Sequence, residues 1–380
     1  MAVRRTQRAG SDRTRRRFPR RQAHATQRQE SPLRPEKWVQ PISLAGISAP
    51  MKGHGAVPPA LIKDPNNIRL AMLGCSRDNG HPYSWSAMFN GYDRNIMDRE
   101  CPFAVIPQYL GSQPLSNLTI AGAKVTHICC TGNGGFTAEQ VARCCLIPNV
   151  VERATDVIGE VDAVIIATDI GAEHVARARP FVEAGMPVFV DKPLVDNAPD
   201  LQVFAGWVAA GRPIMSSSCM RYAKEFLPYR LSTHELGLLR YVSITTMKSW
   251  ECYGIHALES IYPILGPGFL SVRNTGTAER NVVHLRHQCG ADAVVAAIAD
   301  MYGGFGCLQL CGTVGKVQIT SADSFFAFKA QLAAFIAYLR TGIRPFPFTE
   351  TIELMQLVIA GIRSREQGGR EVALAEIGGA

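Results

Sequence analysis

The chain has 380 residues, of which 47% are hydrophobic and 19% are charged, so it is long enough for two domains and too apolar for a mainly disordered protein. Its formal charge of +8 comes from one segment, because residues 1–37 hold eleven arginines and one lysine against three acidic residues. That segment carries +9 and the rest of the chain −1. The net charge is therefore no argument for a nucleic-acid site in the folded part.

Residues 1–66 are rich in Arg, Gln, Pro and Ser and have no sustained apolar period, so we expect a disordered basic tail. Two interpretations of this tail stay open. It contacts phosphates without sequence specificity, or the start is assigned too early and the protein begins downstream, for instance at Met51. In neither case do we expect a specific nucleic-acid partner.

The eleven cysteines include the adjacent pairs Cys129–Cys130 and Cys144–Cys145, and no C-x-x-C pair is matched by a second Cys or His pair. We therefore expect free thiols and no metal site, as in a reducing compartment. No run of 18 apolar residues occurs. These features predict a cytoplasmic protein that does not cross a membrane.

From Ile68 onward, short apolar runs that are typical of buried parallel strands alternate with segments of helical periodicity. Residues 91–122, with several Pro and Gly, interrupt this alternation as an insertion or long loop. The pattern predicts an α/β protein whose N-terminal domain, residues 67–195, has a Rossmann-type, doubly wound parallel sheet. The expected strands are 68–74, 123–130, 161–168 and 187–190, and the expected helices of this domain are 81–90, 137–146 and 173–184, whereas one more helix, 199–210, opens the second domain.

After Pro193 the strands follow one another without helices between most of them. Such a succession predicts a C-terminal α+β domain, residues 196–380, with a largely antiparallel sheet. Its expected strands are 241–248, 270–274, 281–287, 293–300, 306–311 and 316–320, and its last two helices are 324–340 and 350–365.

The turn after the first strand is a degraded form of G-x-G-x-x-G, since Ser76 and Asn79 stand where the second and third glycines would be. A glycine-rich turn that leads into a helix lets backbone N–H groups approach a phosphate. The turn is a dinucleotide-binding turn or an ordinary strand–helix turn. For the first case we expect Gly74, Ser76, Asn79, Gly80 and His81 to contact the cofactor, although His81 could instead cap or pack the helix.

Polar residues also follow the other strands at the edge where open α/β sheets bind ligands. Thr168 ends the third strand, and Asp191 and Lys192 follow the fourth. No acidic residue follows the second strand, where an NAD site usually has one, so the cofactor is NADP, or Thr131 and Asn133 hold the ribose, or binding is weak. Thr131 and Asn133 are equally compatible with simple turn residues, and Lys192 with a surface lysine.

The segment Trp250–Glu259 leads into a helix in which His256 and Glu259 share a face. A histidine at a helix start beside a carboxylate can act as the general acid or base in an alcohol–carbonyl interconversion. The alternative is a histidine that caps the helix or packs in an interface.

These segments, in this order, resemble the Gfo/Idh/MocA family, which is named after glucose–fructose oxidoreductase, inositol dehydrogenase and rhizopine catabolism. Asp191-Lys192-Pro193 matches the Glu-Lys-Pro of that family, and Gly254-Ile255-His256 matches its Gly-x-His. The stretch from His81 to Ser86 adds to the likeness. The resemblance covers about residues 68–375.

The resemblance implies an NAD- or NADP-dependent oxidoreductase that acts on a sugar, sugar nucleotide or cyclitol, with Lys192 and His256 as catalytic residues. It also implies a homodimer or homotetramer formed through the open face of the second sheet. The substrate contacts that we expect come from Arg221, Tyr222, Lys248 and Glu259, of which the first two are also compatible with a structural salt bridge.

The chain departs from the family at Cys252, where relatives have an aspartate four residues before the histidine. Glu251 or Lys248 replaces that aspartate, or the chemistry differs. Two alternatives to a dehydrogenase therefore stay open. One is a lyase or epimerase that uses tightly bound NAD without net oxidation, and the other is a dinucleotide-binding sensor without catalysis.

Overall fold

The computed structural model describes residues 58–302 and 304–378. The disorder expected for residues 1–57 lies outside the described residues. The described chain begins before the expected boundary at residue 66, and its first residues already contact the fold. The N–H of Leu61 donates to the carbonyl of Leu339 at 2.8 Å, and the Leu61 and Ile62 side chains pack against the core.

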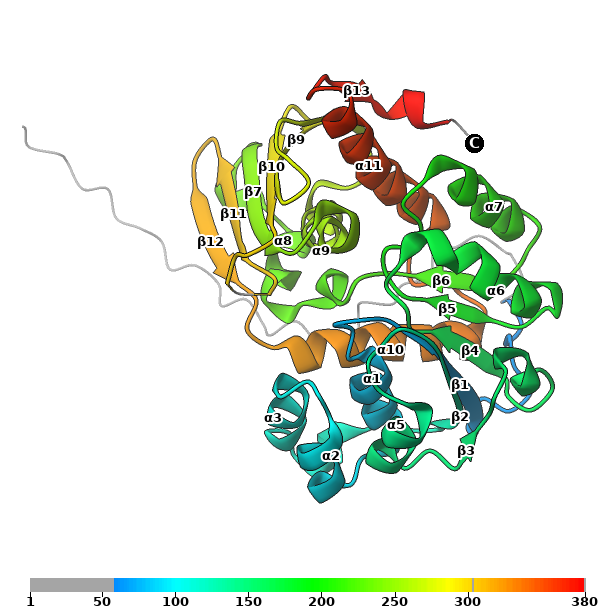
Figure 1. Cartoon of the computed structure of the whole chain (residues 1–380). Helices are drawn as coiled ribbons and strands as arrows, with labels where there is room; N and C mark the ends of the chain where they lie inside the picture. Colours follow the sequence, from blue (N-terminus) through cyan, green and yellow to red (C-terminus); the bar gives the residue numbers. More distant parts are fainter. Residues whose placement is uncertain (1–57, 303, 379–380) are drawn as a thin grey trace, which may run out of the picture. The chain divides into compact units, whose positions relative to one another are not determined.

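A six-stranded parallel sheet, sheet A, forms the first half of the fold (Figure 1). Its order is β3-β2-β1-β4-β5-β6, so the winding reverses between β1 and β4, where doubly wound sheets open a crevice. The expected Rossmann-type sheet is confirmed. Its strands are β1 (Ile68–Cys75), β2 (Ala123–Gly132), β3 (Asn149–Val150), β4 (Ala163–Ile166), β5 (Val188–Val190) and β6 (Ile214–Ser216).

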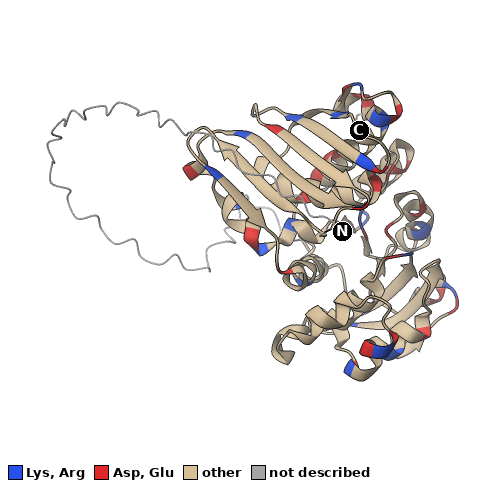
Figure 2. Cartoon of the chain, turned by 60° about the vertical axis from the view of Figure 1, so that its left-hand side comes forward, with Lys and Arg blue, Asp and Glu red and all other residues tan. Residues whose placement is uncertain are grey.

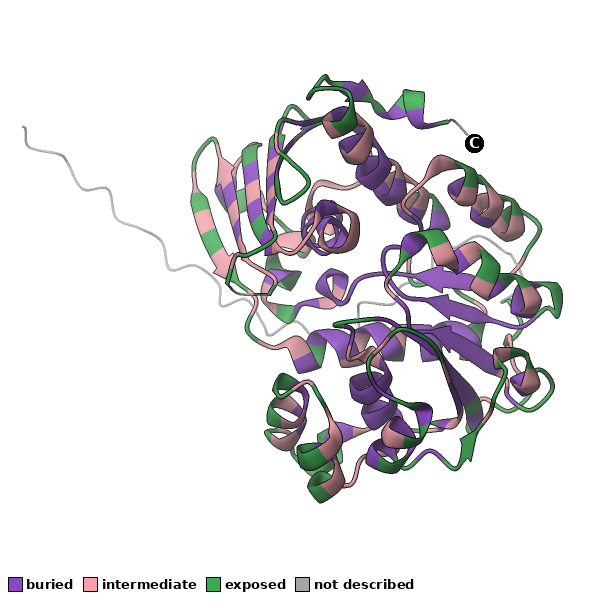
Figure 3. Cartoon of the chain, viewed as in Figure 1, coloured by how far each residue is buried: buried purple, intermediate pink, exposed green. Residues whose placement is uncertain are grey.

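Helices cover both faces of sheet A, which explains why its central strands are continuous apolar runs (Figure 3). Three short helices, α2 to α4, occupy the segment 91–122, for which we expected a loop or insertion. The expected N-cap of α5 is confirmed, since Thr137 accepts a hydrogen bond from the N–H of Gln140. The helices are α1 (His81–Asn90), α2 (Arg94–Glu100), α3 (Val105–Gly111), α4 (Leu115–Leu118), α5 (Ala138–Cys145), α6 (His174–Glu183) and α7 (Ala198–Ala209).

Sheet A continues beyond residue 195, because β6 pairs with β5 in parallel. Strand β6 is thus part of the parallel sheet, and α7 connects it to β5, although we expected residues 196–216 in the second domain. Single turns of 3-10 helix occur at Ala154–Val157, Gly171–Glu173, Cys219–Tyr222, Lys224–Phe226, His234–Leu236 and Leu374–Ile377.

The second sheet, sheet B, has seven strands in the order β12-β11-β7-β10-β9-β8-β13. All neighbours are antiparallel except β7 and β10, so the expected largely antiparallel sheet is confirmed. In β9 and β10, buried side chains alternate with more exposed ones, as in a sheet with one face solvated. The strands are β7 (Leu239–Met247), β8 (Phe269–Asn274), β9 (Arg280–His287), β10 (Asp292–Ile298), β11 (Cys307–Gly312), β12 (Lys316–Thr320) and β13 (Val372–Ala373).

Four more helices complete the fold: α8 (Leu227–Leu231), α9 (Trp250–Leu265), α10 (Ser324–Thr341) and α11 (Phe348–Glu366). Helices α9 and α11 pack on the inner face of sheet B, whereas α10 returns to sheet A (Figure 1). The ring of Phe335 on α10 lies 5.4 Å from that of Phe189 on β5. None of the described helices has the length and hydropathy needed to cross a lipid bilayer.

Candidate active site

Three adjoining cavities lie near the carboxyl edge of sheet A, two at the edge itself and the third beside the ends of β7 and β10 of sheet B. The edge cavity, about 540 Å³, is lined by Arg77, Asp169, Lys248 and Cys252, among others. The inner cavity, about 160 Å³, is lined by His81, Asp169, Lys192, Tyr253 and Phe328, among others. The aromatic cavity, about 830 Å³, shares Val105, Tyr109 and Phe328 with the inner cavity and adds Met247 and Phe305, among others. Ligands in the two larger cavities would meet at the inner one.

The turn after β1 requires glycine at Gly74. Its φ is +85°, and a Cβ there would lie 2.8 Å from Cγ2 of Thr168 at the end of β4. No side chain can therefore stand between the ends of β1 and β4. Ser76 and Asn79, which replace the other two glycines of the motif, turn inward and are buried.

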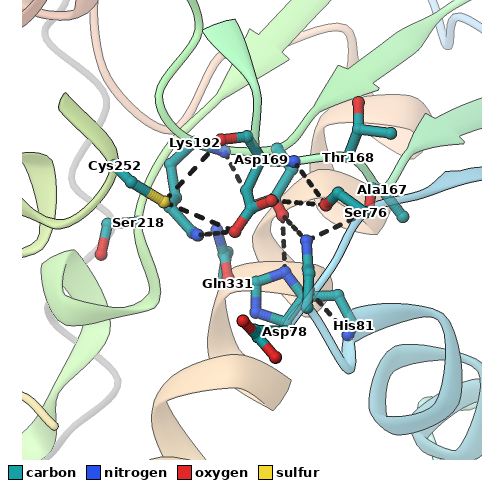
Figure 4. A network of polar contacts seen from close by, with 12 residues as sticks. Ser76, Asp78, His81, Ala167, Thr168, Asp169, Lys192, Ser218, Cys252 and Gln331 are labelled. Atoms are coloured by element: carbon teal, nitrogen blue, oxygen red, sulfur yellow. Dashed lines mark hydrogen bonds and ion pairs between the residues drawn. The ribbon is translucent and has the colours of Figure 1, made fainter. Parts of the chain in front are cut away.

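Asp169, which the sequence analysis did not single out, connects these residues (Figure 4). Its carboxylate accepts a hydrogen bond from the Ser76 hydroxyl and lies 3.6 Å from Nζ of Lys192. Burial alone would raise the pKa of this carboxyl, but the Lys192 ammonium and the Ser76 hydroxyl outweigh burial and hold the pKa at about 2. Asp169 is thus an anion at the centre of the site.

Lys192 follows β5 and is almost fully buried. Burial acts to lower the pKa of the ammonium, but the carboxylates of Asp191 and Asp169 outweigh it and raise the pKa above its ordinary value. The ammonium also lies 5.3 Å from the centre of the Tyr253 ring. A permanently charged donor therefore stands at the wall of the inner cavity.

Asp191 is buried and accepts three hydrogen bonds. The N–H of Lys192 donates to Oδ1 at 2.7 Å, Nδ2 of Asn79 lies 3.2 Å from Oδ2, and Nδ1 of His81 lies 2.6 Å from the same oxygen. The His81 ring stacks on Trp85 with 4.1 Å between centres. These hydrogen bonds bring the predicted cofactor residues Asn79, His81, Asp191 and Lys192 together.

His256 lies in the interior of α9 rather than at its start, because the helix begins at Trp250 with Ser249 as its N-cap. Its Nδ1 lies 2.6 Å from the hydroxyl of Ser218, and the rings of Tyr253 and Phe305 cover it at 4.7 and 4.9 Å. Burial first, and then the positive charge of Lys192, hold the pKa of His256 well below its ordinary value, so the ring is neutral.

Three of the four predicted substrate residues line none of these cavities. Arg221 is buried and ion-paired with Glu259 and with Glu350, the latter at 2.7 Å, and its guanidinium stacks 4.0 Å from the centre of the Phe346 ring. Glu259 also accepts from the N–H of Ser218 at 3.1 Å. Tyr222 lies next to this network. Arg221, Tyr222 and Glu259 therefore connect the Cys219–Tyr222 turn to α9 and α11.

Lys248 and the residues beside it do lie at the site. Its Nζ is 3.4 Å from the backbone carbonyl of Asp78 and 4.6 Å from the Tyr253 ring centre. Cys252 Sγ lies 3.5 Å from Oδ2 of Asp169, and burial together with that carboxylate raises the pKa of the thiol to about 11, despite the nearby Lys192. Glu251 is ion-paired with Arg365 instead.

The two residues at the end of β2 that were predicted to contact the ribose, Thr131 and Asn133, have different surroundings. Nη1 of Arg177, on α6, donates to the Thr131 hydroxyl at 3.1 Å. The same guanidinium is ion-paired with Glu173. Both Thr131 and Arg177 line a groove of about 260 Å³ beside β4. Asn133 is exposed. Thr168 is buried, with its hydroxyl 3.1 Å from Nε2 of His174.

Two further residues of the site come from segments to which the sequence analysis gave no role. Ser218 holds His256, and Gln331 of α10 is buried with its Nε2 donating to the carbonyl of Ser217. An acidic residue directly after an apolar strand could have indicated Asp169, but no local pattern indicates Ser218 or Gln331.

The residues at this edge fit a nicotinamide dinucleotide. The close turn at Gly74 and the volume of the edge cavity suit a dinucleotide, and the lining offers the cations of Arg77 and Lys248 to its phosphates beside four acidic residues, Asp78, Asp169, Asp196 and Glu251. They depart from an NAD site at β2, where the Arg177 guanidinium stands in place of an acidic residue.

No family model matches the sequence, and no curated protein matches it. Solved structures do share its fold. Myo-inositol dehydrogenase from Corynebacterium glutamicum is 17% identical, with a TM-score of 0.61 over 81% of this chain and 99% of that one. Scyllo-inositol dehydrogenase from Lactobacillus casei, with bound NAD(H) and scyllo-inositol, is 13% identical with the same TM-score and coverage.

An oxidoreductase from Agrobacterium radiobacter in complex with NAD+, L-tartaric acid and magnesium is 15% identical, with a TM-score of 0.63 over 82% of this chain and 99% of that one. The fold that the resemblance to the Gfo/Idh/MocA family implied is thereby confirmed, over almost the whole length of these proteins.

Proposed function

We propose that the chain is an NAD- or NADP-dependent dehydrogenase that interconverts a ring hydroxyl and a carbonyl of a cyclitol or sugar. The observation that carries this proposal is the Lys192 ammonium, which is buried, paired with Asp169 and placed at the inner cavity between the two larger ones. The fold of the inositol dehydrogenases supports the choice of cofactor and substrate class.

The dinucleotide would lie in the edge cavity, with Arg77 and Lys248 toward its phosphates and Lys192 toward the nicotinamide end. When bound, a nicotinamide accepts or donates a hydride. Lys192 would donate a hydrogen bond to the reacting oxygen of the substrate, which stabilises the negative charge that develops there during oxidation. The aromatic cavity would hold the rest of the substrate and exclude water.

Asp169 would take the place of the aspartate that relatives have at the position of Cys252. The Cys252 thiol lies 3.5 Å from the Asp169 carboxylate. A carboxylate that follows β4 would therefore lie next to the position at which relatives have a carboxylate on α9. Its pairing with Lys192 keeps the ammonium oriented toward the cavity.

Thermal unfolding of the purified chain with NAD+, NADH, NADP+ and NADPH tests the cofactor, followed by mass spectrometry of any nucleotide that copurifies. We expect stabilisation by at least one nucleotide, by roughly 3 kcal/mol at 100 times its Kd. The substrate is then sought by following reduction of the nucleotide with myo-inositol, scyllo-inositol and D-glucose. The absence of any nucleotide effect would contradict the proposal.

Two controls separate the alternatives. Turnover without added nucleotide, with NAD retained on the protein, would favour a lyase or epimerase. A sensor would be favoured if neither the wild type nor the Lys192→Met variant turns over any substrate and both still bind the nucleotide.

We also propose that the outer face of sheet B forms a contact between copies of the chain. Figure 2 shows few Lys, Arg, Asp or Glu in the middle of the strands of sheet B, and Tyr241, Leu270 and Val282 are large exposed apolar residues on these strands. Light scattering of the wild type and of a Leu270→Lys variant tests the contact, which predicts a smaller particle for the variant.

A further inference from the structure

We propose that His81, held by Asp191, is the residue that exchanges the proton of the reacting hydroxyl, an inference that rests on the proposed dehydrogenase function. From the sequence, His81 is expected among the cofactor contacts and His256 is expected to transfer the proton. The geometry of the two histidines points to the opposite assignment for the proton.

The hydrogen bonds of Asp191 determine which nitrogen of His81 carries a proton. The carboxylate is fully buried and already accepts from the N–H of Lys192 and the amide of Asn79. An anion in this setting accepts a third hydrogen bond, so Nδ1 of His81, 2.6 Å away, is the protonated nitrogen. In the neutral ring Nε2 then carries the lone pair.

The ring itself is fixed in orientation by aromatic neighbours. It stacks on Trp85 at 4.1 Å with 13° between the planes, and the Phe328 ring meets its edge at 5.2 Å and 68°. Among the described residues Nε2 has no hydrogen-bond partner, and 12% of the side chain is exposed, in the wall of the inner cavity. A basic nitrogen is therefore presented to a ligand in that cavity.

His256 has no such access. It is 2% exposed, its Nδ1 lies at hydrogen-bond distance from the Ser218 hydroxyl, and it lines none of the three cavities, whereas Phe305, which packs on it at 4.9 Å, lines the aromatic one. Its neutral ring supports the wall of the site, which makes it a positioning residue in this arrangement.

The proton balance of the step is simple. In the oxidation direction the hydroxyl proton of the substrate passes to Nε2 of His81, the C–H hydrogen leaves as hydride to the oxidised nicotinamide nucleotide, and the C–O bond becomes a carbonyl. Asp191 stays ionised and stabilises the imidazolium. Lys192, Asp169 and Asp78 are the other charged residues in the wall of the inner cavity, and the Asp169–Lys192 pair is neutral overall.

The decisive variants are His81→Asn and His81→Ala, made in the full chain. Asparagine keeps a donor near Asp191 but has no atom at the place of Nε2. We expect kcat to fall by about 10²- to 10⁴-fold, with the nucleotide Kd within threefold of wild type, and imidazole to restore part of the activity of His81→Ala. His127→Asn, a histidine variant on β2 away from the site, is the matched control and should keep wild-type kcat.

A readout independent of turnover is the tautomer of His81, measured by long-range ¹H–¹⁵N NMR of chain labelled with ¹⁵N-histidine and assigned by loss of the signals in His81→Asn. We expect the neutral ring to carry its proton on Nδ1. A proton on Nε2, or a wild-type kcat in a folded His81→Asn variant, would overturn the inference alone. Failure of the wild-type chain to bind any of the four nucleotides would overturn the proposed function and this inference together.

Discussion

At the scale of single residues, the site is a set of charges that compensate one another in a buried place. Asp169 and Asp191 surround Lys192, and each carboxylate has at least one further donor. Buried charges are tolerated only when they are paired and hydrogen-bonded. The stability of the chain and its proton chemistry therefore depend on the same few groups.

The depressed pKa of Asp169 gives a prediction about pH. Its pKa is about 2 in the folded chain against an ordinary value of 3.8, so the carboxylate adds about 2 kcal/mol of stability at neutral pH. This contribution is present above the ordinary pKa and is lost as the pH falls through the folded value. Urea unfolding of wild type and Asp169→Asn at steps from neutral pH to about pH 3 should show a difference that shrinks with acid. A difference independent of pH would contradict the assignment.

The buried pair of Arg221 and Glu259 gives a prediction that separates a structural role from substrate binding. Arg221→Met leaves the Glu259 carboxylate buried without its partner and should lower the free energy of unfolding by about 3–5 kcal/mol. The matched control is Arg286→Met, which removes an exposed pair with Glu371 at 3.7 Å and should cost about 1 kcal/mol or less. Equal, small losses in urea unfolding would contradict the structural role.

Much of the site could be predicted where a residue's position along the chain already fixes its place in space. Asp191 and Lys192 follow an apolar strand, and the ends of parallel strands meet at one edge. The pairing of Arg221 with Glu259 could not be predicted. The spacing of Glu259 along α9 indicates which face of the helix it occupies, but it does not indicate that the turn holding Arg221 packs against that face. The same holds for the access of His81 and His256, which depends on aromatic rings from α9, α10 and the segment before β11.

At the scale of elements, continuous apolar runs identified the long strands, and the boundaries of α1 were predicted to the residue. The two-residue strands β3 and β13 carry too little pattern to be seen. Helices α2 to α4 were missed because they are short and are interrupted by Pro and Gly. The start of α9 was missed because its cap, Ser249, precedes a tryptophan rather than an amphipathic repeat, and this error moved His256 to the wrong part of the helix.

The turn between β1 and α1 gives a prediction at this scale. Gly74 and Gly91 have nearly the same φ, +85° and +82°, but an added Cβ meets Thr168 at Gly74 and nothing within 4 Å at Gly91. Gly91→Ala should cost only the backbone strain of its conformation, φ 82° and ψ −170°, about 1–3 kcal/mol. Gly74→Ala should cost a further 1–3 kcal/mol, roughly, from overpacking, and should weaken nucleotide binding. Urea unfolding of both variants checks this, and equal costs would mean that the turn can open to admit a side chain.

At the scale of the whole described chain, the two sheets share elements that the sequence assigned to one domain. Strand β6 extends sheet A after residue 195, and α10 follows the last long strand of sheet B but packs beneath sheet A. Its Phe328 lines the inner and aromatic cavities, while Phe335 contacts Phe189 of β5. Chain order could predict the two sheets but not this return, which depends on tertiary packing.

The shared helix predicts one unfolding transition for both sheets. Trp85 reports on the surroundings of sheet A, and Trp250, whose Nε1 donates to the carbonyl of Val358 at 2.9 Å, reports on the helices of sheet B. In the double variant Trp85→Phe/Trp207→Phe, which keeps Trp250 as the one tryptophan of the described residues, and in Trp250→Phe, which keeps Trp85 and Trp207 beside sheet A, tryptophan fluorescence and far-ultraviolet circular dichroism should give the same urea midpoint within each variant. Separate midpoints would mean that the sheets unfold independently.

Helix α10 also links ligand occupancy to places that no ligand touches. A molecule held against Phe328 stabilises the helix, and the far side of the same helix covers the interior strands of sheet A. Opening of those strands would then require the ligand to leave first. Amide hydrogens of β4 and β5 should therefore exchange more slowly with deuterium when the aromatic cavity is filled, so that the backbone far from the chemistry records whether the substrate is present.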